Sequence, residues 1–462
     1  MGAAWKGWIF LCGGTIDHIG CLDDRKGVQQ HEAGQPVSPQ HGRHRNGKYM
    51  KIWLVRDLEP LPTDPGAPRL MRAGMLASTL AAQGHQTTWF TSTFNHSAKT
   101  RRATCDQCLD AGQNLTIRVF DAPGYTRNIS LRRIWHNRRF AEAFRRYAVT
   151  SGERPDVLVA DLPTTEAAKA AVAFGSDAGI PTVVSIRDLW PDFFADFLPA
   201  AARPLARLAL RPLDAQARFA CRHATSLVGI SERYLAWGQD KGAGRATDQD
   251  RVFPLGYRRS RAASSEAIEA TLDRLGISRT RHIVAFVGSW GATYDLDRVF
   301  EACRLLAGRD DILFVLAGDS ASRPELAAAL RELPNVILTG WIDSDTIASL
   351  LSRAAIGLLP YSAKAPQGLP NKVFEYMAYG AYQLATLGGE IAALYATTGT
   401  GRSLPQASPA ELAGAIEAAL ADPAILQGRE QRIAVFEKRF DADKIYADMA
   451  EHLVEVARSG AR

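Results

Sequence analysis

The sequence predicts an α/β protein of two doubly wound domains, each with a mostly parallel sheet covered by helices. Two observations support this fold class. Short apolar runs alternate with helical patterns along most of the chain, and the alternation stops at a polar segment, about 256–280, before it restarts. The length of 462 residues, with 46% hydrophobic and 23% charged residues, allows two separate hydrophobic cores.

Residues 1–49 show no hydrophobic periodicity, and we expect them to be a disordered extension or a mis-annotated start. The folded chain is expected to begin at Met50, directly before a buried strand at 51–55. This strand opens the first domain, residues 50–255, and a Pro/Gly-rich loop and a helix at about 69–83 follow it.

The remainder of the first domain alternates regularly. Strands are expected at 86–90, 115–120, 157–160, 182–186 and 226–230, and helices at 130–147 and 164–173. Ser231 is predicted to cap the helix that follows the last of these strands. A short strand at 251–256 then leads into the linker, 256–280.

The second domain, residues 281–440, repeats the pattern. Strands are expected at 283–287, 312–317, 336–338, 356–359 and 382–386, with helices that begin at Leu296, Pro324, Ser344 and Lys372. A last helix at about 442–458, within the terminal segment 441–462, is expected to pack back on the first domain. Two similar halves joined by a hinge make a cleft between them the default ligand site.

Several function classes lack their sequence signatures. No GxGxxG follows the first strand of either half and no GxxxxGK[ST] occurs, which argues against a dinucleotide dehydrogenase and a P-loop enzyme. No DxD stands at a plausible strand end, so we expect neither a metal nor another cofactor. The cysteines are scattered, which is typical of a reducing compartment. The role of Cys105 and Cys108, one CxxC, stays open because zinc needs two further ligands.

The stretch 361–391 has the pattern of a ligand site at the ends of parallel strands. An apolar run ends in a glycine-bearing loop, a short helix at about 372–379 carries Glu375, and a second apolar run with a Gly-Gly pair follows. A glycine loop lets a ligand approach the backbone, and a helix start offers free N–H groups to an anion. Because Glu375 lies too deep to cap the helix, its carboxylate is expected to accept hydrogen bonds from sugar or ribose hydroxyls.

Other strand ends of the second domain also carry glycines, at 288–291, 318–319 and 340–342. Small residues there admit a diphosphate, with Ser289 as a donor, and backbone groups of Trp341 and Ile342 could read a nucleobase edge. The nearest cations are Lys364 and Lys372, and we favour Lys372 because it starts a helix.

In the first domain, the turn from Gly66 to Arg69 precedes a helix. It is a place where an acceptor or a phosphate could meet the backbone. The alternative is a plain turn that only starts the helix.

Five segments together resemble GT-B-fold glycosyltransferases of the retaining family 4: VFPLGY at 252–257, FVGS at 286–289, LAGD at 316–319, TGWID at 339–343 and GLPNKVFEYMAYG at 368–380. The last of these, with EPLPTDPGAPRLMR at 59–72 and IRDLWPD at 186–192, resembles bacterial transferases of surface-polysaccharide assembly, such as the L-fucosamine transferases. The resemblance covers the chain from about residue 50 to its C-terminus.

This resemblance implies roles in the loop and helix at 364–375. The family carries a Glu-x7-Glu signature whose second glutamate, which binds the ribose, matches Glu375; its first, which contacts the donor sugar, is replaced by Gln367. Lys364, Gly368, Leu369, Asn371 and Lys372 would complete the donor site. Glutamine can hydrogen-bond but carries no charge, so the departure puts the donor's identity in doubt.

The segment SIRDLWPD at 185–192 follows a strand of the first domain and would face the acceptor. Asp188 is our candidate to contact the acceptor hydroxyl, with Arg187 beside it. The alternative for Asp188 is a helix cap or a structural salt bridge. The resemblance implies retention without an assigned nucleophile, so positioning and stabilisation of the leaving diphosphate would do most of the work.

Net charge +6 and a pI near 9.0 fit a phosphorylated ligand, an anionic membrane or nucleic acid. Two basic stretches, 127–154 and 203–222, interleave arginines with aromatic or apolar residues, which suits anionic lipid and a polyprenyl-diphosphate acceptor. The alternative is a solvated charged face. No nucleic-acid recognition motif is present, and no apolar run approaches the roughly 18 residues that span a bilayer.

We therefore expect an enzyme that transfers a hexose or aminosugar from a nucleotide sugar, UDP- rather than GDP-linked, to a lipid-linked glycan of a cell-surface polysaccharide. It would be cytoplasmic and peripheral on the inner face of the cytoplasmic membrane. Two alternatives stay open: a GT-B-fold epimerase of nucleotide sugars, which needs no acceptor, and a degenerate nucleotide-binding scaffold subunit.

Overall fold

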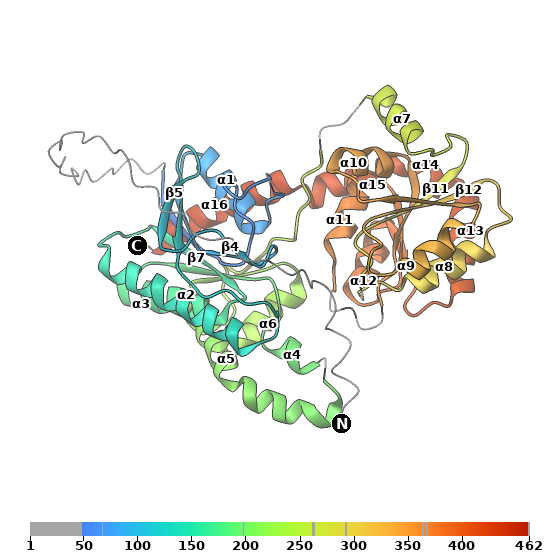
Figure 1. The fold of residues 1–462 in the computed structure, drawn as a ribbon. Helices are drawn as coiled ribbons and strands as arrows, with labels where there is room; N and C mark the ends of the chain where they lie inside the picture. Colours follow the sequence, from blue (N-terminus) through green and yellow to red (C-terminus); the bar gives the residue numbers. More distant parts are fainter. Residues whose placement is uncertain are drawn as a thin grey trace, which may run out of the picture. The chain divides into compact units, whose positions relative to one another are not determined.

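The computed structural model describes residues 49–460, except Ala67, Phe197, 261–263, Ala292, 363–364 and 366–367. The expectation for the extension at 1–49 therefore lies outside the described residues, apart from Tyr49. Two Rossmann-like α/β domains make up the described chain (Figure 1). The predicted fold class is confirmed.

The first sheet has eight strands in the order β10-β9-β8-β7-β1-β2-β6-β5, and only β5 runs antiparallel to its neighbour. Its strands are β1 (Lys51–Val55), β2 (Gln86–Ser92), β5 (Gln107–Asp110), β6 (Leu115–Phe120), β7 (Val157–Leu162), β8 (Thr182–Ile186), β9 (Ser226–Gly229) and β10 (Arg251–Val252). The order reverses between β1 and β7, and the carboxyl ends of strands at such a switch point border a ligand crevice. A separate hairpin pairs β3 (Phe94–Asn95) with β4 (Thr100–Arg101).

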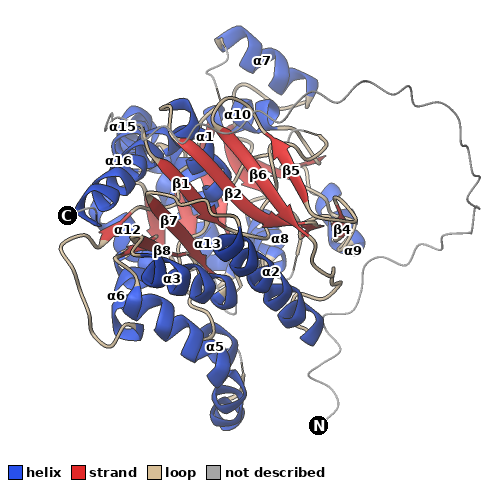
Figure 2. Ribbon diagram, turned by 90° about the vertical axis from the view of Figure 1, so that its left-hand side faces the viewer, coloured by secondary structure: helices blue, strands red, loops and turns tan. Residues whose placement is uncertain are grey.

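Helices cover both faces of this sheet (Figure 2). They are α1 (Arg72–Ala82), α2 (Leu131–Thr150), α3 (Thr165–Ala178), α4 (Asp192–Asp196), α5 (Arg203–His223) and α6 (Glu232–Lys241), with a 3-10 turn at Ala200–Ala202. Side chains alternate along β1, as a strand requires. Ile52 and Leu54 pack into the core that includes α1, whereas Trp53 and Val55 pack with α2 and α3.

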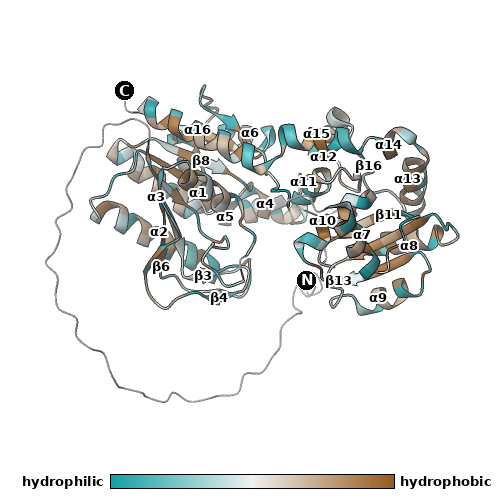
Figure 3. Ribbon diagram, turned by 90° about the horizontal axis from the view of Figure 1, so that it is seen from above, coloured by the Kyte–Doolittle hydropathy of each residue, from teal (hydrophilic) through white to brown (hydrophobic). Residues whose placement is uncertain are grey.

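The second sheet is parallel, in the order β13-β12-β11-β14-β15-β16. Its strands are β11 (His282–Val287), β12 (Ile312–Ala317), β13 (Val336–Gly340), β14 (Ala354–Leu359), β15 (Tyr382–Ala385) and β16 (Gly401–Ser403). The switch point falls between β11 and β14. Hydrophobic colouring follows the strands, while outer helices such as α8 show both colours (Figure 3).

The helices around the second sheet are α7 (Ser265–Arg274), α8 (Leu296–Leu305), α9 (Pro324–Arg331), α10 (Ser344–Arg353), α11 (Asn371–Ala378), α12 (Glu390–Thr398), α13 (Pro409–Ala421), α14 (Pro423–Gln427) and α15 (Arg429–Arg439). The segment predicted as a linker includes one of these helices. The linker 256–280 contains α7, because Ser264 caps a segment whose Leu272 is buried in the second domain's core.

Two further details differ from expectation. The strand expected at 251–256 is only the two residues of β10, since Pro254 cannot donate a ladder hydrogen bond. Ser231 stands at the N-cap position of α6, but its side chain makes no capping hydrogen bond; its Oγ donates to Glu390 instead.

The chain passes between the two sheets twice, and the two passages pair with each other. Tyr257 N–H donates to Phe440 O over 3.1 Å, and Ala442 N–H donates to Tyr257 O over 3.1 Å. A Cβ on Gly256 would lie 2.6 Å from Ala442 Cα, so only glycine allows this approach. The last helix, α16 (Ala442–Gly460), then packs beside α1, with Tyr446, Met449 and Leu453 in the first domain's core (Figure 1).

Candidate functional site

The strand ends of the second sheet meet backbone to backbone at three glycines. Gly288 N–H donates to Ala317 O over 2.8 Å, and Gly318 N–H donates to Gly340 O over 2.7 Å. Gly318 has φ +142°, and a Cβ on it would lie 1.9 Å from Gly288 O. Gly318 therefore needs to be glycine, because its backbone lies directly against that of Gly288.

Helix α11 is fixed against these strand ends by its buried face. Val287 N–H donates to Tyr376 Oη over 2.9 Å, and Gln383 Nε2 donates to Val373 O over 3.0 Å. Phe374 and Met377 are buried in the same core. The N-cap residue, Pro370, makes no side-chain cap, so the first N–H groups of the helix, those of Asn371 included, stay available to an anion.

Lys372 reaches from the first turn of α11 to the loop after β11. A Cβ on Gly288 would lie 3.0 Å from Lys372 Cε and 3.6 Å from its Nζ. Burial lowers the pKa of Lys372, while the nearby Glu375 carboxylate raises it and Arg69 lowers it. Ser289, one residue further on, is exposed. A cation, a hydroxyl and a helix start thus border the same glycine loop.

Glu375 is buried and lies between two cations. Its Oε2 is 3.6 Å from Lys372 Nζ, and its Oε1 is 3.8 Å from Arg69 Nη1. The Arg69 guanidinium stacks over the Tyr257 ring at 4.7 Å and remains 61% exposed. Arg69, predicted on the acceptor side, and Glu375, predicted on the donor side, are thus neighbours.

The other predicted donor and acceptor residues have fewer contacts with neighbouring side chains. Trp341 is 78% exposed beside the end of β13, and Ile342 packs at the edge of the second domain's core. Gly66 has φ +84° with open space around it. Lys364 and Gln367 lie outside the described residues.

Gly368 and Leu369 sit at the contact with α6. A Cβ on Gly368 would collide with a carboxylate oxygen of Glu390. The other carboxylate oxygen of Glu390 accepts the hydrogen bond from Ser231 Oγ. Leu369 packs at the edge of the second domain's core.

At the end of β8, two adjacent residues have different surroundings. Arg187 contacts Glu59 and, over 3.0 Å, Asp161, and it is mostly buried. These carboxylates raise the pKa of Arg187 against the effect of burial. A structural salt bridge, the alternative role for Asp188, is instead made by the neighbouring residue Arg187.

Asp188 has no ion pair within the described ranges, and its side chain is exposed. Protein atoms around it still limit its hydration, which raises the pKa of Asp188; Arg56, Arg187 and Arg133 oppose this shift. Asp188 is thus an exposed carboxylate at the end of β8, and its role toward an acceptor stays a prediction.

Two buried polar groups near the first switch point escaped sequence reasoning. Arg56 contacts Glu59 over 3.2 Å and extends the network of Arg187 and Asp161. Asp57, fully buried, accepts from His136 Nε2 over 2.6 Å and from Ser92 Oγ over 2.7 Å. Glu59 lies in a segment that carried the resemblance, but nothing local indicates the pairing of Asp57 with His136.

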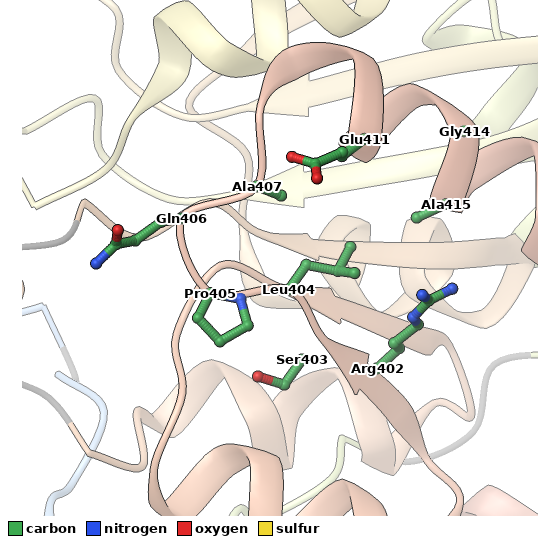
Figure 4. A pocket seen from close by; sticks show the side chains of 9 residues that line it. All are labelled: Arg402, Ser403, Leu404, Pro405, Gln406, Ala407, Glu411, Gly414 and Ala415. Carbon is green, nitrogen blue, oxygen red and sulfur yellow. The ribbon is translucent and has the colours of Figure 1, made fainter.

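A pocket of about 480 Å³ lies elsewhere, between β16 and α13 (Figure 4). Its lining runs from Arg402 to Ala407 with Glu411, Gly414 and Ala415. Glu411 is occupied there in a capping box with Ser408. None of the predicted site residues lines this pocket, so it does not belong to the site.

Within the described part of the chain, no three His, Cys, Asp or Glu side chains gather in a way that could hold a metal ion. Among the helices of the described chain, none has the length and apolarity to cross a bilayer.

Two known families match the chain, one over each of its two domains. The family described as "Glycosyl transferase 4-like domain" matches residues 71–256, and the family "Glycosyl transferases group 1" matches residues 281–422. The chain belongs to the glycosyltransferases of the GT-B superfamily. No curated protein sequence matches this glycosyltransferase.

Solved structures resemble this glycosyltransferase over most of its length. Sucrose-phosphate synthase from Thermosynechococcus elongatus is 17% identical with a TM-score of 0.61, covering 87% of this chain and 97% of its own. The Anabaena protein HepE in complex with UDP is 18% identical with a TM-score of 0.61, covering 87% and 99%. WaaG, a glycosyltransferase involved in lipopolysaccharide biosynthesis, is 16% identical with a TM-score of 0.59, covering 87% and 98%. At these identities the likeness concerns the fold.

Proposed function

We propose that this glycosyltransferase moves a sugar from a UDP-sugar to a lipid-linked glycan, carried on a polyprenyl diphosphate, in cell-surface polysaccharide assembly. The carrying observation is the arrangement at α11: Lys372 lies against the glycine loop at Gly288, and Glu375 lies between Lys372 and Arg69. The sequence resemblance to L-fucosamine transferases supports an aminosugar or hexose donor for an O-antigen, a capsule or an exopolysaccharide.

The donor half of the proposal rests on charge placement. The N–H groups at the start of α11 and the Lys372 ammonium would face the diphosphate, where negative charge grows as the sugar leaves. Glu375 would accept hydrogen bonds from the ribose, and Trp341 and Ile342 would border the base. HepE was solved with UDP and with UDP-glucose, which supports UDP over GDP.

The acceptor half places Asp188 at the reacting hydroxyl. One exposed carboxylate is not a pair at glycosidase spacing, so hydrolysis by that route is not proposed. The sequence resemblance supports transfer with retention, in which positioning and stabilisation of the leaving group lower the barrier. Arg187 would act through the network of Glu59 and Asp161 by holding the loop that carries Asp188.

Exposed apolar residues support the proposed membrane surface. On or beside α2, Leu131 is 84% and Trp135 is 53% exposed; on α5, Leu205 is 72% and Leu208 is 54% exposed. Both helices also carry exposed arginines. Basic helices with exposed apolar side chains bind anionic leaflets, which fits a peripheral enzyme on the inner face of the cytoplasmic membrane.

The test is a ligand-induced thermal shift with UDP, GDP and a panel of their sugars, followed by transfer to a synthetic polyprenyl-diphosphate-linked sugar. We expect stabilisation by UDP and a lipid-linked product. Lys372→Gln is expected to weaken UDP binding roughly tenfold, as loss of a charge-assisted contact does. Glu430→Gln, an exposed glutamate on α15, is the control.

Each other outcome redirects the proposal. Equal shifts with GDP would contradict the UDP donor. Release of an epimerised UDP-sugar without any acceptor would identify an epimerase, and nucleotide binding without turnover across all donors and acceptors would identify a scaffold subunit.

A further inference from the structure

A cluster of polar side chains in the first domain, which we name the Tyr125 cluster, gathers His96, Lys99, Tyr125, Asn128 and Arg133. Tyr125 Oη lies 2.6 Å from His96 Nδ1, and Lys99 Nζ lies 3.2 Å from the same nitrogen. Lys99 Nζ donates to Asn128 Oδ1 over 2.7 Å, and Arg133 Nη1 donates to Asn128 O over 2.8 Å. Both cations also lie over the Tyr125 ring, at 5.0 and 5.7 Å.

The cluster has two positive charges, and the carboxylates that act on it, Asp57 and Asp188, do so from beyond ion-pair distance of either cation. Within the described ranges, neither Lys99 nor Arg133 has a carboxylate at ion-pair distance. Burial and the Arg133 charge lower the pKa of Lys99, and burial lowers the pKa of Arg133. Burial and both cations lower the pKa of His96 to about 4, so His96 is neutral and accepts at Nδ1. An anion in this cluster would relieve the mutual repulsion.

Arg133 also has an N–H donor without a hydrogen-bond partner among the described residues. This donor, its Nε, is buried. A buried guanidinium donor that stays unpaired costs free energy, and native structures usually provide it with a ligand, a water or a protein acceptor. A phosphate oxygen suits a guanidinium because the planar fork can donate two parallel hydrogen bonds.

The backbone around the cluster is held in an unfavourable conformation. Lys99 has φ +57° and Leu58 has φ +71°, in the left-handed region that non-glycine residues seldom occupy. Leu58 packs with Phe94 and Tyr125 in a small buried group. Such positions are energetically unfavourable and cluster at ligand sites, where the surrounding structure imposes them.

The cluster lies between the predicted acceptor carboxylate and an exposed apolar segment. Arg133 stacks on Trp190 at 4.5 Å, two residues after Asp188, and the Asp188 charge raises the pKa of Arg133. On the other side, Asn128 is followed by Ile129, which is 76% exposed, and by Leu131, which is 84% exposed. Arg133 thus contacts the aromatic ring of Trp190, and the exposed apolar side chains of Ile129 and Leu131 lie close to it in the chain.

We propose that the Tyr125 cluster binds the phosphate or diphosphate group of the lipid acceptor, with Ile129 and Leu131 along its apolar chain. The inference rests on the proposed function and names the subsite for the acceptor's anionic group. A phosphate held by Lys99 and Arg133 would place the sugar that follows it toward Asp188.

The test measures binding of detergent-solubilised geranylgeranyl diphosphate to the full chain by titration calorimetry. Geranylgeraniol supplies the apolar chain alone, and inorganic pyrophosphate supplies the charge alone. We expect the diphosphate lipid to bind at least tenfold more tightly than either. The variant Lys99→Gln/Arg133→Gln should lose this preference, and Lys99→Arg/Arg133→Lys should retain most of it.

The matched control is Lys169→Gln/Arg118→Gln, which removes a lysine and an arginine that also lie over aromatic rings, those of Phe219 and Tyr147. UDP binding, measured on every variant, reports the donor site, and thermal unfolding reports whether the first domain has folded. Equal lipid affinity in the cluster variant and the control would overturn the inference. So would equal binding of geranylgeraniol or of pyrophosphate by the wild type.

The two failures are distinguishable. A cluster variant that still binds the diphosphate lipid, in an enzyme that transfers sugar to a lipid acceptor, overturns the subsite alone. Absence of UDP binding or of any transfer by the wild type contradicts the proposed function itself.

Discussion

Lys372 Nζ lies 3.6 Å from Glu375 Oε2, one turn along α11, and the lysine side chain lies against Gly288 in the loop that follows β11. The Glu375 charge raises the pKa of Lys372, in opposition to burial. The carboxylate therefore has two effects in the proposed donor site: it can bind hydroxyls directly, and it keeps its lysine neighbour protonated.

This coupling predicts a pH effect of Glu375→Gln. Without the carboxylate, burial and Arg69 lower the pKa of Lys372 further, so the ammonium is lost at a lower pH than in the wild type. UDP binding should weaken roughly tenfold at neutral pH and decline further as pH rises. Titration calorimetry between pH 6 and 9 measures this; a parallel pH profile in the variant and the wild type would contradict the coupling.

Gly318→Ala should destabilise the donor side of the second domain. The added methyl group would lie 1.9 Å from Gly288 O, at a backbone φ of +142° that alanine rarely adopts. We expect a loss of about 2–4 kcal/mol in the free energy of unfolding, read from the urea midpoint. Gly291→Ala is the matched control, because nothing lies within 4 Å of its Cβ; equal midpoints for both variants would refute the close contact.

The pair of Asp57 and His136 predicts a pH window for stability. His136 Nδ1 lies 2.7 Å from Pro123 O and Nε2 lies 2.6 Å from Asp57, so two acceptors favour the doubly protonated ring. The Asp57 charge raises the pKa of His136 above 6.5 despite burial.

The pKa of Asp57 falls from 3.8 to about 2, because the His136 charge and the hydrogen bonds that Asp57 accepts outweigh burial. The histidine contribution is complete below pH 6.5 and disappears as pH rises through the raised pKa; the aspartate contribution is complete above 3.8 and disappears toward pH 2.

His136→Asn should therefore cost most between about pH 4 and 6.5, with roughly 3–5 kcal/mol lost because the Asp57 carboxylate stays buried without its cation. Chemical denaturation at several pH values gives the difference. His223→Asn, on the exposed end of α5, should change little, and a pH-independent cost for His136→Asn would show that the ring is not charged.

Asp188→Asn should reduce kcat by about 10²–10³ without loss of stability. Because the pKa of Asp188 is raised, its carboxylate protonates at a higher pH than an ordinary aspartate, and activity should fall as pH falls through that value. The acidic limb of the pH–rate profile should change in the variant. Asp177→Asn, on the exposed face of α3, serves as control, and an unaltered limb would exclude Asp188 from the reacting centre.

Arg187→Gln, in contrast, should lower stability. The guanidinium neutralises Glu59, which is fully buried, and Asp161. Removing it leaves the buried carboxylates with Arg56 as their remaining cation, at a cost of about 3 kcal/mol. Thermal denaturation with UDP titration separates this effect from catalysis; a stable variant with reduced kcat would make Arg187 a catalytic residue instead.

Much of the fold could be predicted from the sequence because it depends on local patterns. The strands at 51–55, 115–120 and 182–186 have the expected bounds, since each is a short apolar run between turn residues. Helix α7 was missed because its amphipathic pattern is short and its only fully buried side chain is Leu272.

The proximity of Gly288, Gly318 and Lys372 could be predicted for a related reason. Residues that follow parallel strands converge on one edge of the sheet, so the glycines and the lysine meet there; their role toward a donor stays a prediction. The pairing of Asp57 with His136 joins residues 79 positions apart, and the Tyr125 cluster joins the turn between β3 and β4, the loop before α2 and α2 itself. Such side-chain partnerships follow from packing, which no local pattern encodes.

Helix α16 has a consequence for biosynthesis. Tyr446, Met449, Leu453 and Val456 belong to the core of the first domain, although 180 residues and more separate them from the rest of that domain. During synthesis, the second sheet has all its strands after Ser403, whereas the first domain lacks part of its core until Val456 has left the ribosome. The domain that is translated first is therefore the one that completes its folding last.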